Sequence, residues 1–394
     1  MTTFYKTFFS SLAAGIILVA TFFAGYLVRD QQASGRDFPI LIEAKNLLNQ
    51  YGYHPVPDGP VLEYGMIRGM IQAYNDPYTS FSEPVQHELA SNSLEGKFGG
   101  IGVQLQEDSQ GYPVLIPIPG SPAEKIGILE GDRLVQADEL LILAETPHET
   151  IQAAIRGKVG TKVVIVIERP PDYHRLEFEI ERAEFNLPSV TGYLAPGESR
   201  LGIIKVNLMA ATTPDEIKAT VNDLQDRGAL VFALDLRDNF GGLLTSGVDT
   251  ARLFLMEGQV MQEQYKGQEV KSYSVENPGS LTDLPLVILV NQNTASAAEI
   301  AAGALQAQQR AILIGARTYG KDSVQLVFEL KDKSSLQVTA ARWWIPTATG
   351  GQPQPLAGVG LQPDIILDMT ELSGQDQSID PVLQQAIQYL LGGT

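Results

Sequence analysis

A serine and a lysine late in the chain are the residues whose types and setting best suit nucleophilic chemistry. Ser296 lies in the segment 291–299, NQNTASAAE, and Lys321 follows it after one further predicted helix. The apolar run 286–290 predicts a buried parallel strand before the serine, and the alanine-rich run 297–307 predicts a helix after it. A hydroxyl at such a strand-to-helix junction projects beside helix N–H groups that lack partners within the helix. The pair therefore predicts a serine nucleophile with a lysine base.

Histidine, the usual base for a serine nucleophile, is badly placed in this chain. A serine hydroxyl is weakly nucleophilic until a neighbouring base takes its proton. The segments with chemical potential all follow position 230, whereas the four histidines lie in the first half of the chain: His54, His87, His148 and His174. The chain has no cysteine, which excludes a thiol nucleophile and disulfide bonds. No cluster with metal-ligand spacing is evident either, so we expect no metal and no cofactor.

A purely structural interpretation of both residues stays open. Ser296 with Glu299 three residues later fits the capping box, in which the serine caps a helix and the glutamate reaches back to the cap. That arrangement needs no function. A lysine after a glycine in a loop, as Lys321 follows Gly320, is usually a solvated surface charge. The surrounding segments must decide between the two interpretations.

A pair of glycines follows another predicted strand, 229–236. The segment 234–242, LDLRDNFGG, runs from this strand into a turn that ends with Gly241 and Gly242. Glycines let backbone N–H groups approach a reacting carbonyl without side-chain interference, as an oxyanion hole requires. An ordinary strand–loop–helix turn would show the same pair, so by itself the pair indicates little.

Several segments together are similar to one family in order and spacing. They are 234–242, 294–300 and 318–325, joined near the end by 358–364, GVGLQPD. On these segments the chain resembles the carboxyl-terminal processing (tail-specific) proteases, which are serine peptidases with a Ser/Lys dyad and an embedded PDZ domain. The resemblance extends over nearly all of the chain after residue 37.

The resemblance implies a role for each matching polar residue. It places the nucleophile at Ser296, the general base at Lys321 and the residue that orients the lysine at Gln325. The first two are 321 − 296 = 25 residues apart, which is enough for one helix and a return strand. To act as a base near neutral pH, a lysine with an ordinary pKa of roughly 10.4 must lose about three pKa units. The apolar strand after Lys321 predicts the burial that this loss requires.

Backbone N–H groups form the family's oxyanion hole, which here implies Ala297 together with one glycine of the 241–242 pair. Gly242 is favoured, and Gly241 stays open. The chain departs from the family in two places. Phe240 stands where proline or glycine is common, and Asp322 follows the lysine where glycine is common. Asp322 matters more, because a carboxylate close to Lys321 would favour the charged amine and weaken it as a base.

A β-rich module precedes this region, over residues 96–183. Its order of strands and helices resembles a PDZ domain. The glycine-rich loop 99–103 would expose successive N–H groups that hold a C-terminal carboxylate, while the adjacent strand edge accepts the peptide as an added strand. The candidate residues of this loop are Gly99, Gly100, Ile101, Gly102 and Val103. A simple chain turn at this loop stays open, and the segment 140–148 lacks the usual Asp/Asn-Gly turn.

The remaining pattern predicts a mixed α/β fold with several parts. From about residue 184 strands and helices alternate, which is typical of an α/β core with its active site at the carboxyl ends of the strands. We expect a transmembrane anchor at 8–28, an N-terminal helical region at 37–95 and the inserted PDZ domain. A serine protease core at 184–372 and a C-terminal tail helix at 373–394 follow.

The N-terminal apolar segment indicates where in the cell the protein is located. Residues 8–28 are almost wholly apolar or small, with Lys6 before them and Arg29 after them, which is typical of one membrane-spanning helix. A cleaved signal peptide is the alternative, although its cleavage motif is poor here. The family resemblance implies that the catalytic part lies outside the cytoplasm. Residues 75–80, NDPYTS, predict a turn for which structural and functional interpretations cannot be separated.

Composition limits the partners. The formal net charge of −18 and the isoelectric point near 4.6 disfavour nucleic acid. The helical region 37–95 resembles the family's dimer- or platform-forming part, which is compatible with a homo-oligomer. We expect a membrane-anchored, extracytoplasmic serine endopeptidase that recognises apolar C-terminal tails of proteins and cleaves nearby through an acyl-enzyme. A non-catalytic PDZ adaptor or chaperone is the alternative, and the joint presence of Ser296, Lys321 and Gln325 disfavours it.

Overall fold

The computed structural model describes most of the 394 residues. The described ranges are 38–57, 59–95, 97–108, 110–146, 148–186, 188–346, 356–367 and 380–392. The chain divides into two compact units, Met1–Ala73 and Tyr74–Thr394. Each unit is described by itself.

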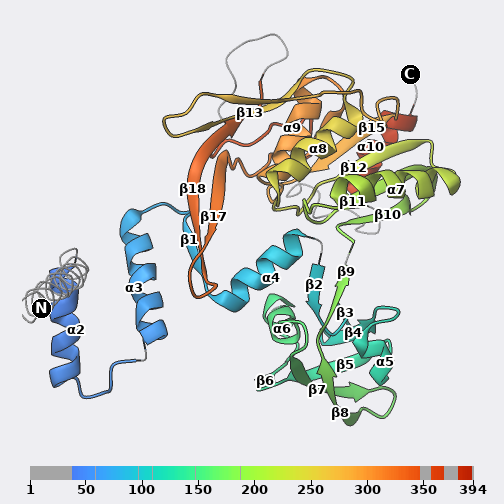
Figure 1. Cartoon of the computed structure of the whole chain (residues 1–394). Helices are drawn as coiled ribbons and strands as arrows, with labels where there is room; N and C mark the ends of the chain where they lie inside the picture. Colours follow the sequence, from blue (N-terminus) through green and yellow to red (C-terminus); the bar gives the residue numbers. More distant parts are fainter. Residues whose placement is uncertain are drawn as a thin grey trace, which may run out of the picture. The chain divides into compact units, whose positions relative to one another are not determined.

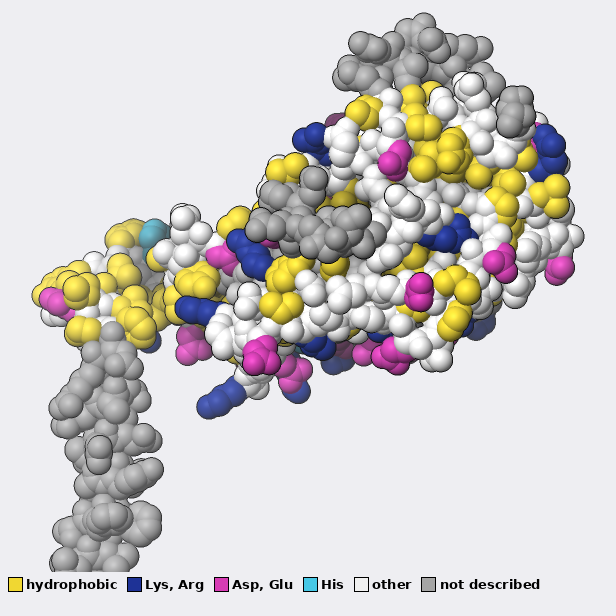
Figure 2. Space-filling view, turned by 90° about the horizontal axis from the view of Figure 1, so that it is seen from above, with side chains coloured by type: hydrophobic (Ala, Val, Ile, Leu, Met, Phe, Trp, Pro, Cys, Tyr) yellow, Lys and Arg dark blue, Asp and Glu magenta, His cyan; other side chains and the backbone are white. Residues whose placement is uncertain are grey.

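The first unit consists of two exposed helices. They are α2 (Pro39–Tyr51) and α3 (Gly59–Tyr74), whose last residue is already part of the second unit. Neither helix has a buried residue, and large apolar side chains such as Ile40 and Leu48 are exposed on α2. Figure 2 shows hydrophobic side chains at the molecular surface. The predicted anchor, 8–28, lies outside the described residues. Among the helices that are described, none is long and apolar enough to cross a membrane.

The core of the second unit is a six-stranded sheet (Figure 1). Its strand order is β10–β11–β12–β15–β16–β19, and every neighbouring pair is parallel except β10 with β11. Every residue of β12 and β15 is buried, as expected for the apolar central strands of a parallel sheet. The strands are β10 (Val190–Ala195), β11 (Glu198–Val206), β12 (Val231–Asp235), β15 (Leu286–Val290), β16 (Ile312–Gly315) and β19 (Ile365–Ile366).

Helices cover both faces of this sheet. Because successive strand residues point to opposite faces, Ile204, Leu234 and Ile288 pack against three helices, whereas Ile203, Ala233 and Val287 pack against a fourth. The first face carries α7 (Thr213–Asp226), α8 (Leu244–Phe254) and α9 (Ala297–Ala307); the other carries α10 (Pro381–Leu391). Because both faces of these strands are buried, their sequences are continuous apolar runs.

A second, antiparallel sheet contains the two strands that follow Lys321, β17 and β18. Its order is β1–β18–β13–β14, and β17 also pairs with β18. The β17–β18 hairpin closes over a polar turn in which the Leu330 N–H donates to Ser334 O at 2.7 Å. The strands are β1 (Ser80–Ser82), β13 (Gln259–Tyr265), β14 (Lys271–Ser274), β17 (Ser323–Glu329) and β18 (Ser335–Trp344).

The PDZ module has a separate apolar core, which includes Leu115, Ile151 and Ile165. Its sheet order is β3–β4–β5–β7–β8, with β6 on β5, and β2 pairs with β9 next to it. The strands are β2 (Lys97–Gly100), β3 (Val103–Glu107), β4 (Pro113–Pro117), β5 (Asp132–Ala137), β6 (Leu140–Leu141), β7 (Lys162–Arg169), β8 (His174–Glu181) and β9 (Ala183–Asn186). The helices of this region are α4 (Pro84–Leu94), which precedes the module, α5 (Pro122–Ile126) and α6 (His148–Ile155).

The mixed α/β prediction is confirmed. The predicted strand 286–290 and helix 297–307 coincide with β15 and α9, and the apolar strand predicted after Lys321 corresponds to β17. The antiparallel strands β13 and β14 were not predicted. They extend the sheet in which β18 lies, so they support the strands that follow the lysine.

Candidate active site

Ser296 occupies a strained turn between β15 and α9. Its backbone angles are φ 55° and ψ −120°, in a region that non-glycine residues rarely adopt. The loop is held in this shape from both sides: the Thr294 hydroxyl donates to Leu236 O at 2.8 Å, and the Ala295 N–H donates to Asn239 O at 3.0 Å. Strain that the surroundings enforce is typical of functional turns that project a nucleophile.

A buried carboxylate links the serine to the lysine. Glu299, in the first turn of α9, is fully buried. Its Oε2 accepts from the Ser296 and Lys321 N–H groups, both at 2.9 Å. Its Oε1 accepts from the Gly320 N–H at 2.8 Å and from the Thr318 hydroxyl at 2.5 Å. The glutamate predicted to complete a capping box therefore also fixes the backbone of the lysine loop.

The burial of this carboxylate has an electrostatic consequence. Burial raises the pKa of Glu299, and the four hydrogen bonds that it accepts act in the opposite direction. Each of the four donors favours the ionised form, since a protonated carboxyl could not accept all of them equally well. One buried side chain thus fixes the backbone on both sides of the proposed proton transfer.

Lys321 lies half-buried just before β17. Burial lowers the pKa of its amine, and the Glu299 carboxylate raises it in part. Burial is the larger effect, which is the direction that a lysine base requires. Among the described residues no hydrogen bond joins its Nζ to the Ser296 Oγ. Catalytic hydrogen bonds are often long in the absence of substrate and tighten in the complex.

Asp322 does not neutralise this effect. Its carboxylate binds the Arg342 guanidinium at 2.5 Å, and its carbonyl accepts from the Trp343 N–H at 2.8 Å. The weakening of Lys321 that was expected from Asp322 is not among the causes of its pKa shift, which are burial and Glu299. The paired cation on β18 offsets its charge.

Gln325 lies on β17, two residues into the strand. Its amide nitrogen donates to Ser323 Oγ at 2.8 Å and more weakly to Thr339 Oγ1 at 3.4 Å. In the described part of the chain no hydrogen bond joins Gln325 to Lys321. Lys321 lies just before β17 and Gln325 lies within it, four positions later, and the orienting role of Gln325 stays a prediction.

The glycine pair approaches the nucleophile closely. A Cβ at Gly241 would lie 2.9 Å from Ser296 Cβ and 3.1 Å from Ala297 N, and one at Gly242 would lie 2.3 Å from Met209 O. Both glycines have positive φ, 102° and 143°. No larger residue fits either position without displacing the backbone.

The two glycine N–H groups differ in what they bind. The Gly241 N–H donates to Asn239 Oδ1 at 2.9 Å and is engaged. In the described residues the N–H groups of Gly242 and Ala297 have no acceptor. Two unengaged N–H groups beside a serine are what an oxyanion hole offers. This geometry supports Gly242 over Gly241.

Side chains that the sequence reasoning did not single out hold the glycine turn. Asp238 accepts from the Asn291 and Asn293 amides at 2.8 and 2.9 Å. This contact ties the turn after β12 to the turn after β15. Short polar residues after two adjacent parallel strands were the signal that could have revealed it.

A second polar network lies beneath the turn. Arg237 pairs with Asp235 at 2.8 Å and with Asp380, the N-cap of α10, at 2.6 Å. Burial alone would lower the pKa of Arg237. The two carboxylates raise it by more than burial lowers it, so the guanidinium stays charged. The network anchors the end of β12 to the opposite face of the sheet.

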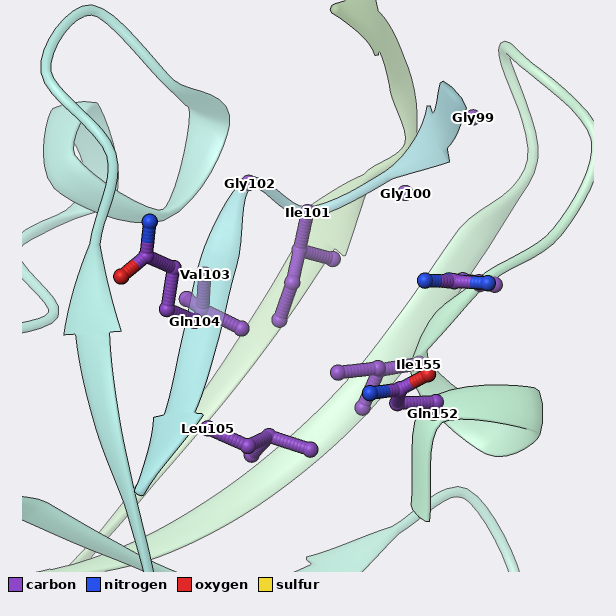
Figure 3. A pocket seen from close by; sticks show the side chains of 10 residues that line it. Gly99, Gly100, Ile101, Gly102, Val103, Gln104, Leu105, Gln152 and Ile155 are labelled. Carbon is purple, nitrogen blue, oxygen red and sulfur yellow. The ribbon is translucent and has the colours of Figure 1, made fainter. Parts of the chain in front are cut away.

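The glycine-rich loop of the PDZ module lines a pocket of about 340 Å³ (Figure 3). The five predicted loop residues, 99–103, come together there. Helix α6 supplies the opposite wall through Gln152 and Ile155, followed by Arg156, which was not predicted. The carbonyls of Ile101 and Gly102 accept from Ala123 and Ile118, while the N–H groups of these two residues have no acceptor in the described residues.

Within the described ranges, no group of three or more His, Cys, Asp or Glu side chains is arranged to hold a metal ion.

The chain is similar to known peptidases. Residues 200–367 match the profile of peptidase family S41, and residues 117–169 match that of a PDZ domain. The chain is 34% identical over 74% of its length to the carboxy-terminal processing protease CtpA of Bacillus subtilis, of which it spans 62%. It is 33% identical over 84% of its length to a carboxyl-terminal-processing protease of Synechocystis, of which it spans 77%.

A solved structure shares the fold. The structure of an S41 protease from Bacteroides fragilis aligns with a TM-score of 0.51 at 16% identity, over 89% of this chain and 97% of that one. The S41 match includes both Ser296 and Lys321, and the PDZ match lies within the module that precedes them. The chain belongs to peptidase family S41 and is a PDZ-containing relative of the carboxyl-terminal processing proteases.

Proposed function

We propose that this chain is a serine endopeptidase that cleaves proteins near their C-terminal tails through a Ser/Lys dyad. One observation carries the proposal: the buried Glu299 fixes the backbone of both Ser296 and Lys321 beside two unengaged N–H groups. This arrangement is more than a capping box requires. A cap needs only the bond to Ser296.

The dyad works by moving one proton back and forth. The neutral amine of Lys321 takes the hydroxyl proton as the Ser296 Oγ attacks the scissile carbonyl carbon. The resulting oxyanion accepts from the Ala297 and Gly242 N–H groups. As the C–N bond breaks, Lys321 returns the proton to the leaving amine, which yields the acyl-enzyme.

Deacylation repeats these steps with water. Lys321 takes a proton from a water molecule, whose oxygen attacks the ester carbonyl. The second tetrahedral intermediate collapses and Ser296 regains its proton from the lysine. The free enzyme and a new C-terminal carboxylate remain.

The PDZ pocket supplies the substrate class. Its N–H groups at Ile101 and Gly102 suit a terminal carboxylate, and Ile155 on α6 gives the pocket an apolar wall. An apolar C-terminal tail would add as a strand along the β3 edge. Protein tails are therefore the partners that the site fits best.

The location of the enzyme is part of the proposal. The apolar segment 8–28 would anchor the chain in a membrane, with the catalytic part on the extracytoplasmic side. Release after signal cleavage is the alternative. Fractionation of cells that express the full chain, followed by protease accessibility, distinguishes an anchored product from a released one.

The proposed activity is tested with the full chain in detergent and an unfolded protein that ends in an apolar tail. The parent should cleave the tail, whereas Ser296→Ala and Lys321→Ala should not. Tail binding without cleavage by the parent would contradict the proposal and would instead favour the adaptor alternative.

A further inference from the structure

The turn 75–80 is a built structure rather than a loose connection. Asp76 Oδ2 accepts from the Thr79 hydroxyl at 2.5 Å, and Oδ1 accepts from the Tyr78 N–H at 3.3 Å. Asn75 adopts a positive φ of 59°, which asparagine tolerates better than most residues. The segment has no role in the mechanism given above, although its turn-forming sequence, NDPYTS, is distinctive.

The turn is also tied to the sheet beside the lysine. Its last residue begins β1, which pairs antiparallel with β18 in the register Ser80 to Gln337. Thr79 is buried, and its Oγ1 accepts from the Thr339 N–H at 3.3 Å. Thr339 faces Gln325 across the β17–β18 ladder. The turn is therefore fixed against the strands that follow the base.

This attachment places an aromatic ring over the base. The Lys321 Nζ lies 5.2 Å from the centroid of the Tyr78 ring. Burial raises the pKa of the Tyr78 hydroxyl, and a hydrogen bond with Tyr319 adds to this. The phenol thus stays neutral at physiological pH and brings no negative charge to the amine.

A neutral ring in this position acts on the amine in two ways. It excludes water from one side, which disfavours the ammonium form before reaction. Its π face attracts a cation within about 6 Å, with an effect on an equilibrium of about two- to thirtyfold. That attraction is realised only when the lysine becomes charged, as it does during attack by the serine.

We propose that Tyr78 is a positioning residue that closes the Lys321 amine to water and offers its π face to the ammonium formed when Lys321 takes the proton of Ser296. This inference rests on the proposed Ser/Lys mechanism. A carboxylate in the same place would attract the ammonium too, but it would raise the pKa of the resting lysine more than the weaker attraction of a neutral ring does.

Other ionisable groups near the base are accounted for. Glu299 on α9 raises the pKa of Lys321, and Asp322 is paired with Arg342. Asp76, in the turn itself, has its pKa lowered: burial alone would raise it, but the hydrogen bonds that it accepts outweigh that effect. Among the described residues, Glu299 and the Tyr78 ring act on the amine, while Tyr319, Asp322 and Arg342 act on Tyr78.

The test uses the full chain with three replacements of Tyr78 and compares pH profiles of kcat/KM on a quenched tail peptide. Tyr78→Phe retains the ring, Tyr78→Leu retains apolar bulk without a π face, and Tyr78→Ala admits water. Thr79→Val loosens the turn without touching the ring. Tyr53→Ala, at a side chain that is 95% exposed, is the matched control. Thermal unfolding establishes that each variant is folded.

The rate of Ser296 labelling by a fluorophosphonate, measured over the same pH range, reports on the serine without a peptide substrate. We expect parental profiles for Tyr78→Phe and Tyr53→Ala. In Tyr78→Ala the acidic limb should move to higher pH by on the order of half a unit or more, because the hydrated amine regains its proton more readily.

In Tyr78→Leu the acidic limb should move to lower pH, because the amine stays shielded but loses the π face that favours the ammonium, and the plateau rate should fall several-fold. Thr79→Val should resemble a weaker Tyr78→Ala. Folded Tyr78→Ala and Tyr78→Leu proteins with parental limbs and plateaus in both assays would overturn the inference. Absence of labelling and of cleavage in the parent would instead contradict the Ser/Lys mechanism, so the two failures are distinguishable.

Discussion

Around Ser296 buried side chains hold the backbone in addition to backbone hydrogen bonds, whereas around the PDZ glycine loop backbone hydrogen bonds hold it. Glu299, Asn239 and Thr294 each fix a loop of the first site from a different element. In the PDZ loop, the carbonyls of Ile101 and Gly102 bind N–H groups of the neighbouring turn. A reacting group must be held within a fraction of an ångström, while an added peptide strand brings its own hydrogen-bond partners. The difference matches chemistry in one site and recognition in the other.

Removing the nucleophile should separate the two sites most completely. We expect Ser296→Ala to lower kcat/KM by at least about a thousandfold, because the residual rate then depends on binding and the oxyanion hole alone. Binding of a fluorescent tail peptide to the PDZ pocket, measured by anisotropy, should stay within twofold of the parent. A parallel loss of tail binding would break the comparison.

Replacing the oxyanion glycine should cost somewhat less. Gly242→Ala places a Cβ against Met209 O at 2.3 Å and strains a φ of 143°, so its N–H must shift. Loss of one oxyanion donor typically costs about 10²–10³ in kcat. Single-turnover kinetics measure the effect. Gly197→Ala is the matched control, because its φ is also positive but nothing lies within 4 Å of its Cβ. Equal activity of the two variants would contradict the role of Gly242.

Changing the central carboxylate to an amide should weaken both the fold and the reaction. In Glu299→Gln an NH₂ group meets N–H donors, so at least one buried donor loses its acceptor. A loss of about 2–3 kcal/mol in the free energy of unfolding is expected from urea titration. We expect kcat to fall by about tenfold or more, because the Ser296 and Lys321 backbones separate. Glu257→Gln, the same change at an exposed carboxylate after α8, is the control. A Glu299→Gln enzyme with parental activity and stability would contradict the role of Glu299 in fixing the Ser296 and Lys321 backbones.

Blocking the carboxylate of the substrate tests the recognition site by itself. An amidated tail peptide has no terminal carboxylate, so it cannot accept charge-assisted hydrogen bonds from the loop N–H groups. We expect KM to rise by about tenfold with kcat little changed. Steady-state kinetics on paired free-acid and amidated peptides measure this. Equal KM values would show that the loop does not hold the tail's carboxylate.

The smallest expected effect is on stability. The pKa of Lys321 is lowered from 10.5 in the native state, so between that lowered value and 10.5 the unfolded chain holds more protons than the folded one. The unfolding free energy should therefore rise with pH across this window. Below the window the folded chain carries the cost of a buried ammonium.

Lys321→Met should consequently be more stable than the parent at neutral pH, with a gain that shrinks as the pH approaches 10.5. Urea titrations at several pH values give the curve, and Lys218→Met on α7 is the exposed control. A gain that does not change with pH would argue that Lys321 is not titrating abnormally.

Much of the fold could be predicted because its signals are local. The apolar runs of β12, β15 and β17 and the helical pattern of α7 and α9 define elements without knowledge of their neighbours. The strands β13 and β14 carry polar residues on their exposed faces, so their pairing is decided by β18, far along the chain. That information is not local.

The same limit applies to the site. Ser296 and Lys321 were found through a motif, and Glu299 was seen only as a cap. Its bonds to Thr318, Gly320 and Lys321 join residues about twenty positions apart, and no spacing rule predicts them. The place of Tyr78 over Lys321 depends on a strand pairing across more than 250 residues. Such contacts follow from the fold, and the sequence alone does not reveal them.

The most direct test of the central claim is mass spectrometry of the enzyme after brief reaction with an activated ester of a tail peptide. The peptide that contains Ser296 should gain one acyl group in the parent at neutral pH. The adduct should be lost in Lys321→Ala and recovered in that variant only as the pH or an added amine supplies a base. An acyl group on another residue, or equal acylation without Lys321, would contradict the Ser/Lys account.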